Sequence, residues 1–138
     1  MPVDLKDVGE YFDHMQRMWQ GHGCSAEPLL PSGQVFEYER DEDGNYTGRG
    51  HLSARIGFPE SEDAFLAIDD WLEPRPGYIA RQSYAYDLIY KGAPLENWHR
   101  HHGSDHRHVG HERQRIESVT LEEAIEKSRD ALSRATPP

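Results

Sequence analysis

The stretch "HLSARIGFPESEDAFLAIDDWLEPRPGYIARQSYAYDLIY", residues 51–90, decides the fold, because three β-strands and two turns can be read from it. In its first part apolar and polar residues alternate, which predicts a half-buried strand with Leu52, Ala54, Ile56 and Phe58 on the buried face. "AFLAIDDWLE" and "YIARQSYAYDLIY" predict two more strands, and one face of the latter carries Tyr84, Tyr86, Leu88 and Tyr90. The turns "PESED" and "PRPG" are short, so the strands are expected to be antiparallel neighbours.

The segments before this stretch add a strand and a helix. "QVFEYER", residues 34–40, alternates in a way that suits a strand. Apolar residues at helical spacing predict a helix over residues 3–19, which Gly21 and Gly23 end. Residues 20–33 are expected to form a loop.

The segments after it predict a last short strand, "RQRIESV", and a C-terminal helix, "TLEEAIEKSRDAL". Thr120 as N-cap and Glu123 three residues later form a capping box, and the inward face carries Leu121, Ala124, Ile125, Ala131 and Leu132. We therefore expect one α+β domain over residues 1–138, in which an antiparallel meander of four to five strands carries both helices on one face. Its expected parts are 1–33, helix and loop; 34–119, sheet; and 120–133, helix.

The net charge is -10, which argues against generic binding of nucleic acid because an acidic surface repels phosphates. The charge is uneven, however. Between Lys91 and Arg115 five basic residues face three acidic ones, so this window carries +2 and the remainder -12. A local basic patch on an acidic body suits a site for one anionic group better than a long nucleic-acid track.

The single cysteine, Cys24, excludes an internal disulfide and a cysteine-based zinc site. No apolar run approaches the roughly 18 residues of a membrane span, and the first residues lack the apolar core of a signal peptide. We therefore expect a cytoplasmic protein without a membrane partner.

Six of the nine histidines fall within "NWHRHHGSDHRHVGH", residues 97–111, called the histidine tract below. Three explanations compete for it. The imidazoles form a metal site, they serve acid–base catalysis on a phosphodiester, or they belong to a solvated loop or partner interface without chemistry.

The text "RQSYAYDLIYKGAPLENWHRHH", followed by "DHRH" and "VTLEEAIEKSRDAL", resembles the TumE-type toxin family of prokaryotic toxin–antitoxin systems. The resemblance covers roughly Gly50 to Leu132, and its matching positions are Tyr84, Tyr86, His101, His102, His106 and His108. Where the family tends to have Arg-Tyr-Asp, this chain has Asn97, Trp98 and His99, so an arginine and a carboxylate are missing. This protein is either divergent or uses His99 and Arg100 instead. The resemblance implies a toxin with an antitoxin partner of the helix-turn-helix type and RNA as its substrate.

Cleavage of RNA by its own 2′-hydroxyl needs a base, an acid and a cation beside the phosphate. Histidines fill both proton roles at neutral pH, and the candidates are His101, His102, His106 and His108. Arg100 or Arg107 would supply the positive charge. This hypothesis makes the protein a small, metal-independent ribonuclease.

Two alternatives stay open. Zinc accepts imidazole, and His102, His106 and His108 offer three ligands, with Asp105 as a fourth or supporting group, although the spacing matches no specific zinc motif. In the other alternative the protein is not catalytic, and the histidine tract contacts a protein partner.

Other residues have two interpretations each. Tyr84, Tyr86 and Trp98 are candidates to stack on RNA bases, yet aromatic residues on a buried sheet face belong more often to the core. Asp69 and Asp70 form either a metal-binding pair or the end of a strand. The histidines outside the tract, His14, His22 and His51, are expected to be structural or exposed.

Overall fold

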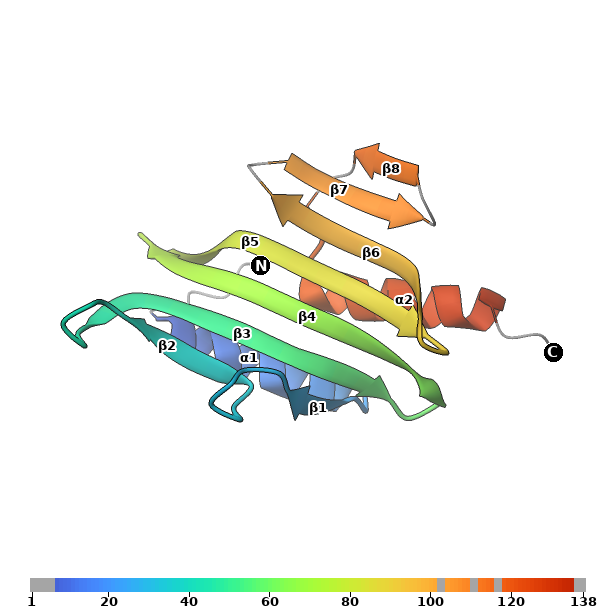
Figure 1. Ribbon diagram of the computed structural model, residues 1–138, viewed down its shortest axis with the longest axis horizontal. Helices are drawn as coiled ribbons and strands as arrows, with labels where there is room; N and C mark the ends of the chain where they lie inside the picture. The colour runs from blue at the N-terminus through green and yellow to red at the C-terminus, as the bar shows by residue number, and fades with distance from the viewer. Residues whose placement is uncertain (1–6, 102–103, 110–111, 116–117, 136–138) are drawn as a thin grey trace.

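The computed structural model describes residues 7–101, 104–109, 112–115 and 118–135, and between residues 101 and 117 it describes only the backbone. Two helices frame eight strands in the chain (Figure 1). In order these are α1 (Val8–Gly21), β1 (Ser25–Pro28), β2 (Phe36–Arg40), β3 (Tyr46–Phe58), β4 (Ser61–Arg75), β5 (Tyr78–Tyr90), β6 (Ala93–His101), β7 (Ser104–Val109), β8 (Glu112–Arg115) and α2 (Leu121–Ala135). Among the described residues no helix is long and apolar enough to cross a membrane.

All strands join one antiparallel sheet in the order β1-β3-β4-β5-β6-β7-β8, and β2 also pairs with β3. From β3 to β8 each strand pairs with the next along the chain, so this part is a meander. The strands β1 and β2 pair with different parts of the long β3, residues 54–57 and 46–52 respectively.

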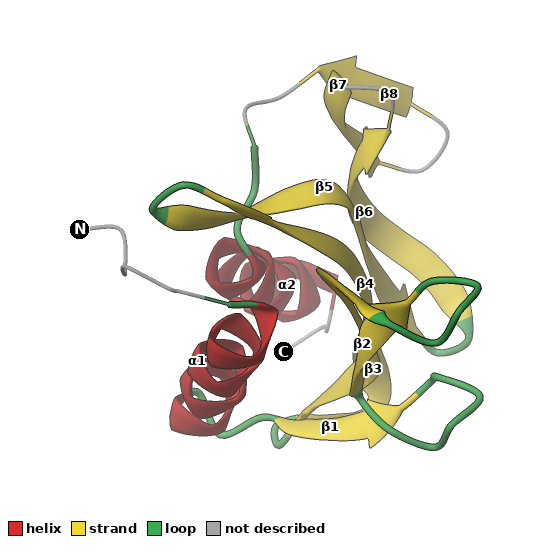
Figure 2. Cartoon of the chain, turned by 90° about the vertical axis from the view of Figure 1, so that its left-hand side faces the viewer, coloured by secondary structure: helices red, strands yellow, loops and turns green. Residues whose placement is uncertain are grey.

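The molecule has two layers, because both helices lie on the same side of the sheet (Figure 2). The α1 helix contacts β2, β3 and β4, whereas α2 contacts β5, β6 and α1. The predicted apolar face of β3, Leu52 to Phe58 in alternate positions, is buried in the same core as Ile125 and Leu132 of α2. The α+β prediction, with both helices on one face, is therefore confirmed. The other side of the sheet, called the open face below, carries no helix (Figure 2).

Local capping explains where the helices begin. Asp7 Oδ1 accepts a hydrogen bond of 2.8 Å from the backbone N–H of Glu10 at the start of α1. In α2, Thr120 Oγ1 accepts from the N–H of Glu123, and Glu123 Oε1 accepts from the N–H of Thr120, which is the predicted capping box. Past the end of α1, Gly23 adopts a φ of 76°, a conformation that glycine tolerates best.

The sheet has more strands than the four to five expected. Residues 25–28 pair with β3 instead of forming a loop. A four-residue strand has no periodicity that a sequence pattern can reveal, so only its partner identifies it. No strand was expected in the histidine tract, but its backbone continues the sheet through β6 and β7. The strand β8, which pairs with β7, overlaps the predicted last strand over residues 113–119.

Candidate functional site

The open face carries a histidine held by a carboxylate at the start of the histidine tract. His99 of β6 lies across from β5, where its Nε2 is 3.0 Å from Oδ1 of Asp87. The His99 side chain is 18% exposed and that of Asp87 36% exposed, so the pair borders solvent. Because Nε2 faces a carboxylate, a neutral His99 carries its proton on Nε2, and Asp87 fixes the orientation of the ring. This is the arrangement of a positioned general base.

A second pair of the same kind lies on the same face, nearer to the other edge of the sheet. The Nε2 of His51 in β3 is hydrogen bonded to Oδ1 of Asp69 in β4. The Trp71 ring stacks on the His51 ring at a centroid distance of 3.8 Å and an interplanar angle of 12°. Trp71 is 43% exposed, so part of this large aromatic surface is available to a flat ligand.

The sheet register connects the two pairs. Asp69 is paired with Ala85, and Ala85 with His99, so Asp69 and His99 lie in one row across three strands. At about 5 Å between strands, they are roughly 10 Å apart. Only the methyl group of Ala85 lies between them in this row. The two histidine–aspartate pairs therefore border one shallow, polar part of the open face.

The same rows continue into the rest of the histidine tract. The β6–β7 register pairs His99 with His106 and Asn97 with His108, and it pairs His101 with Ser104. The side chains of His101, His102, His106, His108 and Arg107 lie outside the described residues. Their catalytic roles, and the zinc-binding alternative, therefore stay predictions.

Arg100 lies on the opposite face from His99, because successive residues of a strand project to opposite sides. Its register partner in β5 is Tyr84, a buried residue on the helix-covered side. The backbone therefore does not favour the hypothesis that Arg100 supplies the positive charge beside a phosphate bound by the histidines of the tract. By the same alternation, Arg107 belongs to the face opposite to His106 and His108.

The three aromatic residues considered for RNA stacking belong to the core. Tyr84, Tyr86 and Trp98 are each at most 1% exposed. Tyr86 and Trp98 are register partners in β5 and β6, and both side chains lie beneath the helices. The core interpretation is confirmed, and these rings cannot stack on RNA bases. Trp71 has the exposure that they lack.

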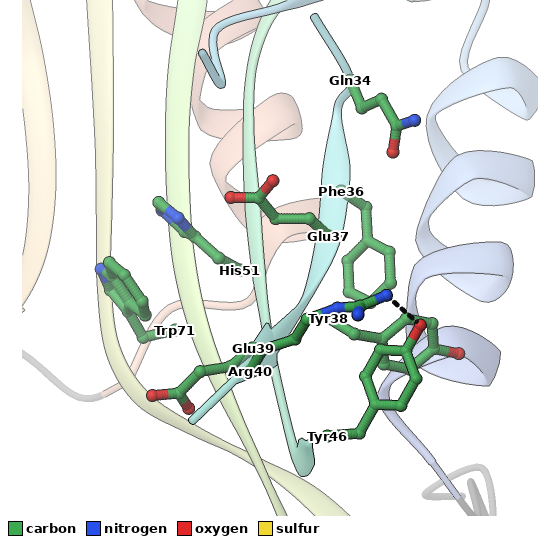
Figure 3. Close-up of a pocket in the computed structure, with 9 residues that line it drawn as sticks. All are labelled: Gln34, Phe36, Glu37, Tyr38, Glu39, Arg40, Tyr46, His51 and Trp71. Atoms are coloured by element: carbon green, nitrogen blue, oxygen red, sulfur yellow. Dashed lines mark hydrogen bonds between the residues drawn. The ribbon is translucent and has the colours of Figure 1, made fainter. Parts of the chain in front are cut away.

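A hollow of about 690 Å³ reaches from the β2–β3 hairpin to His51 and Trp71 (Figure 3). We call it the acidic hollow; its lining is Gln34, Phe36, Glu37, Tyr38, Glu39, Arg40, Tyr46, His51 and Trp71. Arg40 donates a 2.6 Å hydrogen bond to the hydroxyl of Tyr46 and lies over its ring. The carboxylates of Glu37 and Glu39 outnumber this one cation, so the hollow suits a positively charged ligand.

Comparison with known proteins identifies the family to which the chain belongs. The family model of the toxin TumE matches residues 26–134. The chain belongs to the TumE toxin family. No curated protein and no solved structure matches the chain. Membership in a toxin family implies a cognate antitoxin partner for this TumE-family protein.

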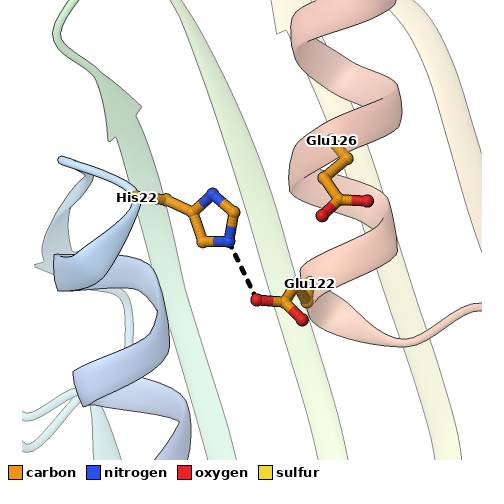
Figure 4. A group of neighbouring side chains, drawn as sticks. All are labelled: His22, Glu122 and Glu126. Atoms are coloured by element: carbon orange, nitrogen blue, oxygen red, sulfur yellow. Dashed lines mark hydrogen bonds and ion pairs between the residues drawn. The ribbon is translucent and has the colours of Figure 1, made fainter.

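In this TumE-family chain, one group among the described residues has the spacing of a metal site (Figure 4). The ligand atoms of His22, Glu122 and Glu126 lie within 4.8 Å of one another. However, Arg129 Nη1 lies 3.4 Å from His22 Nδ1, and a guanidinium only donates. Nε2 then carries the imidazole proton toward Glu122 Oε2, 2.9 Å away, whereas a metal needs a bare nitrogen. The group links the end of α1 to α2.

The neighbouring residues Asp69 and Asp70 do not form a metal-binding pair in this TumE-family protein. They lie within β4, which continues to Arg75, so they project to opposite faces. Asp70 is fully buried, and its Oδ1 accepts a 2.7 Å hydrogen bond from the hydroxyl of Tyr86. Its Oδ2 is buried without a hydrogen-bond partner. Burial raises the pKa of Asp70 to about 6, although Arg81 and the Tyr86 hydroxyl oppose the shift.

We expect Asp70 to make the TumE-family fold more stable as pH falls from 7 to 4. Its pKa of about 6 lies above its ordinary value of 3.8, so the folded protein binds a proton before the unfolded chain does. Across that window the free energy of unfolding should gain about 2 kcal/mol from this group. Urea unfolding at a series of pH values should show the gain in wild type relative to Asp70→Asn. The exposed control Asp130→Asn should show the same pH dependence as wild type. Parallel stability curves for wild type and Asp70→Asn would show that Asp70 does not cause the change.

Three residues of the candidate site on the open face of this TumE-family protein were not predicted from the sequence. His51 was expected to be structural or exposed, and neither Asp87 nor Trp71 was a candidate. The alternation of β3 and β4 does place His51 and Asp69 on the open side. Which carboxylate meets which imidazole depends on register, however, and no local pattern encodes register between strands of this length.

Proposed function

We propose that this protein is the toxin of a toxin–antitoxin pair and that it cleaves RNA on the open face of its sheet. The observation that carries the proposal is the His99–Asp87 pair, together with the register that sets His106 opposite His99. Directly paired residues share a face with their Cβ atoms about 5 Å apart. Two imidazoles at this separation can flank a single phosphate.

In this mechanism His99 takes the proton of the attacking 2′-hydroxyl, and Asp87 holds the imidazole and stabilises its charged form. His106 protonates the leaving 5′-oxygen. The cation beside the phosphate comes from β8, because the register sets Arg115 opposite His106 and Arg113 opposite His108. These arginines replace Arg100 and Arg107, which belong to the other face. The exposed Trp71 offers a base-stacking surface on the same face.

The direct test is an assay of the purified protein on total RNA, with and without EDTA. We expect cleavage that EDTA leaves unchanged. Loss of activity in EDTA and its return with zinc would instead make His102, His106 and His108 metal ligands. Intact RNA after long incubation with folded protein would exclude a nuclease and favour a surface that binds a partner.

We also propose that the antitoxin inserts a basic segment into the acidic hollow. Glu37 and Glu39 give the hollow its negative charge, and the described rim beside it adds Asp7, Glu10 and Asp13 of the α1 region. Opposite charges speed the encounter of two proteins, and salt screens them. A partner docked here would also cover His51 and Trp71.

The association rate with the cognate antitoxin is therefore expected to fall by at least about tenfold between low and high salt, from about 50 mM to about 500 mM. Stopped-flow mixing measures this rate. Glu37→Gln should slow association at low salt, whereas Glu62→Gln, an exposed residue at the start of β4, should not. An association rate that does not change with salt would contradict the proposed docking site.

A further inference from the structure

A second hollow lies at the end of the β4–β5 hairpin, on the side where Arg100 projects. It has a volume of about 540 Å³, and we call it the arginine pocket; its lining is Glu73, Arg75, Tyr78, Ile79, Ala80, Arg81, Gln82 and Arg100. The lining contains three guanidinium groups and one carboxylate. In a chain with a net charge of -10, this concentration of positive charge needs an explanation.

Arg100 supplies the first part of that explanation. Its Nε is buried and has no hydrogen-bond partner among the described residues. A buried donor without an acceptor is costly, so it indicates a missing acceptor. The side chain is only partly buried, which leaves the rest of the guanidinium within reach of the hollow. Arginine presents several N–H groups in one plane, a geometry that fits the oxygens of a phosphate.

Arg81 is held rigidly at the same hollow. It donates hydrogen bonds to the hydroxyl of Tyr86, to the carbonyl of Val119 and to Ser118 Oγ, the last at 2.8 Å. Its guanidinium also lies 4.3 Å from the centroid of the Tyr84 ring. Such a fixed cation provides positive potential without any ordering when a ligand arrives. Arg75, by contrast, is exposed and pairs with Glu73 at 3.2 Å.

We propose that the arginine pocket binds a phosphate group, presented either by a nucleic acid or by a free nucleotide. Its volume lies within the range of about 300–1,000 Å³ that is typical of small-ligand sites. The pocket is separate from the candidate active site, because His99 and Arg100 are successive residues of β6 and face opposite sides. It therefore holds a phosphate other than the one to be cleaved.

Isothermal titration of inorganic phosphate into the full-length protein, in a chloride buffer of low ionic strength, tests the site. Arg100→Gln should weaken binding by about tenfold or more, the usual effect of losing one charge-assisted hydrogen bond. Arg17→Gln is the matched control, because Arg17 is exposed on α1 and its loss changes the net charge equally. The variant Asp105→Asn should tighten binding, since Asp105 is the register partner of Arg100 in β7.

Two short RNAs, one with a 5′-phosphate and one without, identify the source of the phosphate. Their binding is titrated with and without Arg100→Gln, in the His99→Ala background to prevent cleavage. Dependence on Arg100 for the phosphorylated RNA alone indicates a terminal phosphate, and equal dependence for both indicates the RNA backbone. If Arg100→Gln weakens binding of inorganic phosphate but of neither RNA, a nucleic acid is excluded and a free nucleotide is the remaining source. Because binding is read without cleavage, this result does not depend on the nuclease proposal.

Three outcomes would overturn the proposal: no phosphate binding by wild type at millimolar concentrations, equal binding by wild type and Arg100→Gln, or an equal loss in Arg17→Gln. Circular dichroism checks that Arg100→Gln folds. Should that variant unfold, Arg75→Gln decides instead, because the Arg75 side chain is 52% exposed and tolerates replacement. Its loss should weaken phosphate binding severalfold if the pocket is a binding site, and unchanged binding would overturn the proposal.

Discussion

Replacing His99 by alanine is expected to lower the rate of RNA cleavage by about 10²–10⁴-fold, the usual range for loss of a positioned acid or base. The His99 side chain lies on the open face and reaches solvent, so its removal should leave the core and the fold intact. His106→Ala should cause a loss of similar size, because the mechanism needs one imidazole as base and another as acid. His14→Ala, on the α1 side of the molecule, is the control and should cleave like wild type.

The pH dependence separates catalysis from positioning. Two imidazoles in opposite protonation states give a bell-shaped rate profile with both limbs between about pH 5 and 8. Asp87→Asn should keep both imidazoles but lower the cleavage rate, because it removes the carboxylate that holds the His99 ring in place. A flat profile, or a His99→Ala variant that cleaves RNA at the wild-type rate, would refute the assigned role.

Ile125→Asp is expected to destabilise the protein by about 3–5 kcal/mol, enough to unfold most of it at ambient temperature. Ile125 is 0% exposed at the centre of the contact between α2 and the sheet, so an aspartate there would bury an unpaired charge. Leu132→Asp, 5% exposed near the end of the same helix, should have a smaller effect in the same direction. Thermal melting followed by circular dichroism measures both.

The exposed position Ser133 provides the control for these variants. Ser133→Asp adds the same charge one residue after Leu132, and its cost should stay below about 1 kcal/mol. If Ile125→Asp melted at the wild-type temperature, the packing of α2 on the sheet would be wrong, whereas equal losses in Ile125→Asp and Ser133→Asp would point to charge alone.

The long strands and the second helix could be predicted because their patterns are local. Leu52 to Phe58 alternate along β3, and Thr120 and Glu123 form a cap three residues apart, so each signal lies within one element. The strand Ser25–Pro28 could not be found this way, since only β3 gives it a partner. No strand was expected in the histidine tract because its residue types obscure the alternation, although Trp98 falls on the buried side of β6.

The candidate site could be predicted only in part for a related reason. The density of histidine pointed to the correct region of the chain for the His99–Asp87 pair. The partners of these groups come from other strands, and register decides them: Asp87 meets His99, and Asp69 meets His51. Arg100 was grouped with the histidines because it adjoins them in sequence, yet adjacency along a strand means opposite faces in space.

One feature of β6 also restricts how this protein can vary. Trp98 of the core lies between Asn97 and His99, so one strand carries both the packing of the fold and the proposed chemistry. Inserting or deleting one residue after Pro94 would turn His99 toward the helices and Trp98 toward water. Length changes that add or remove two residues would preserve both faces. Among descendants of this gene, the length of β6 is therefore expected to change only in steps of two residues, even where its individual residues change.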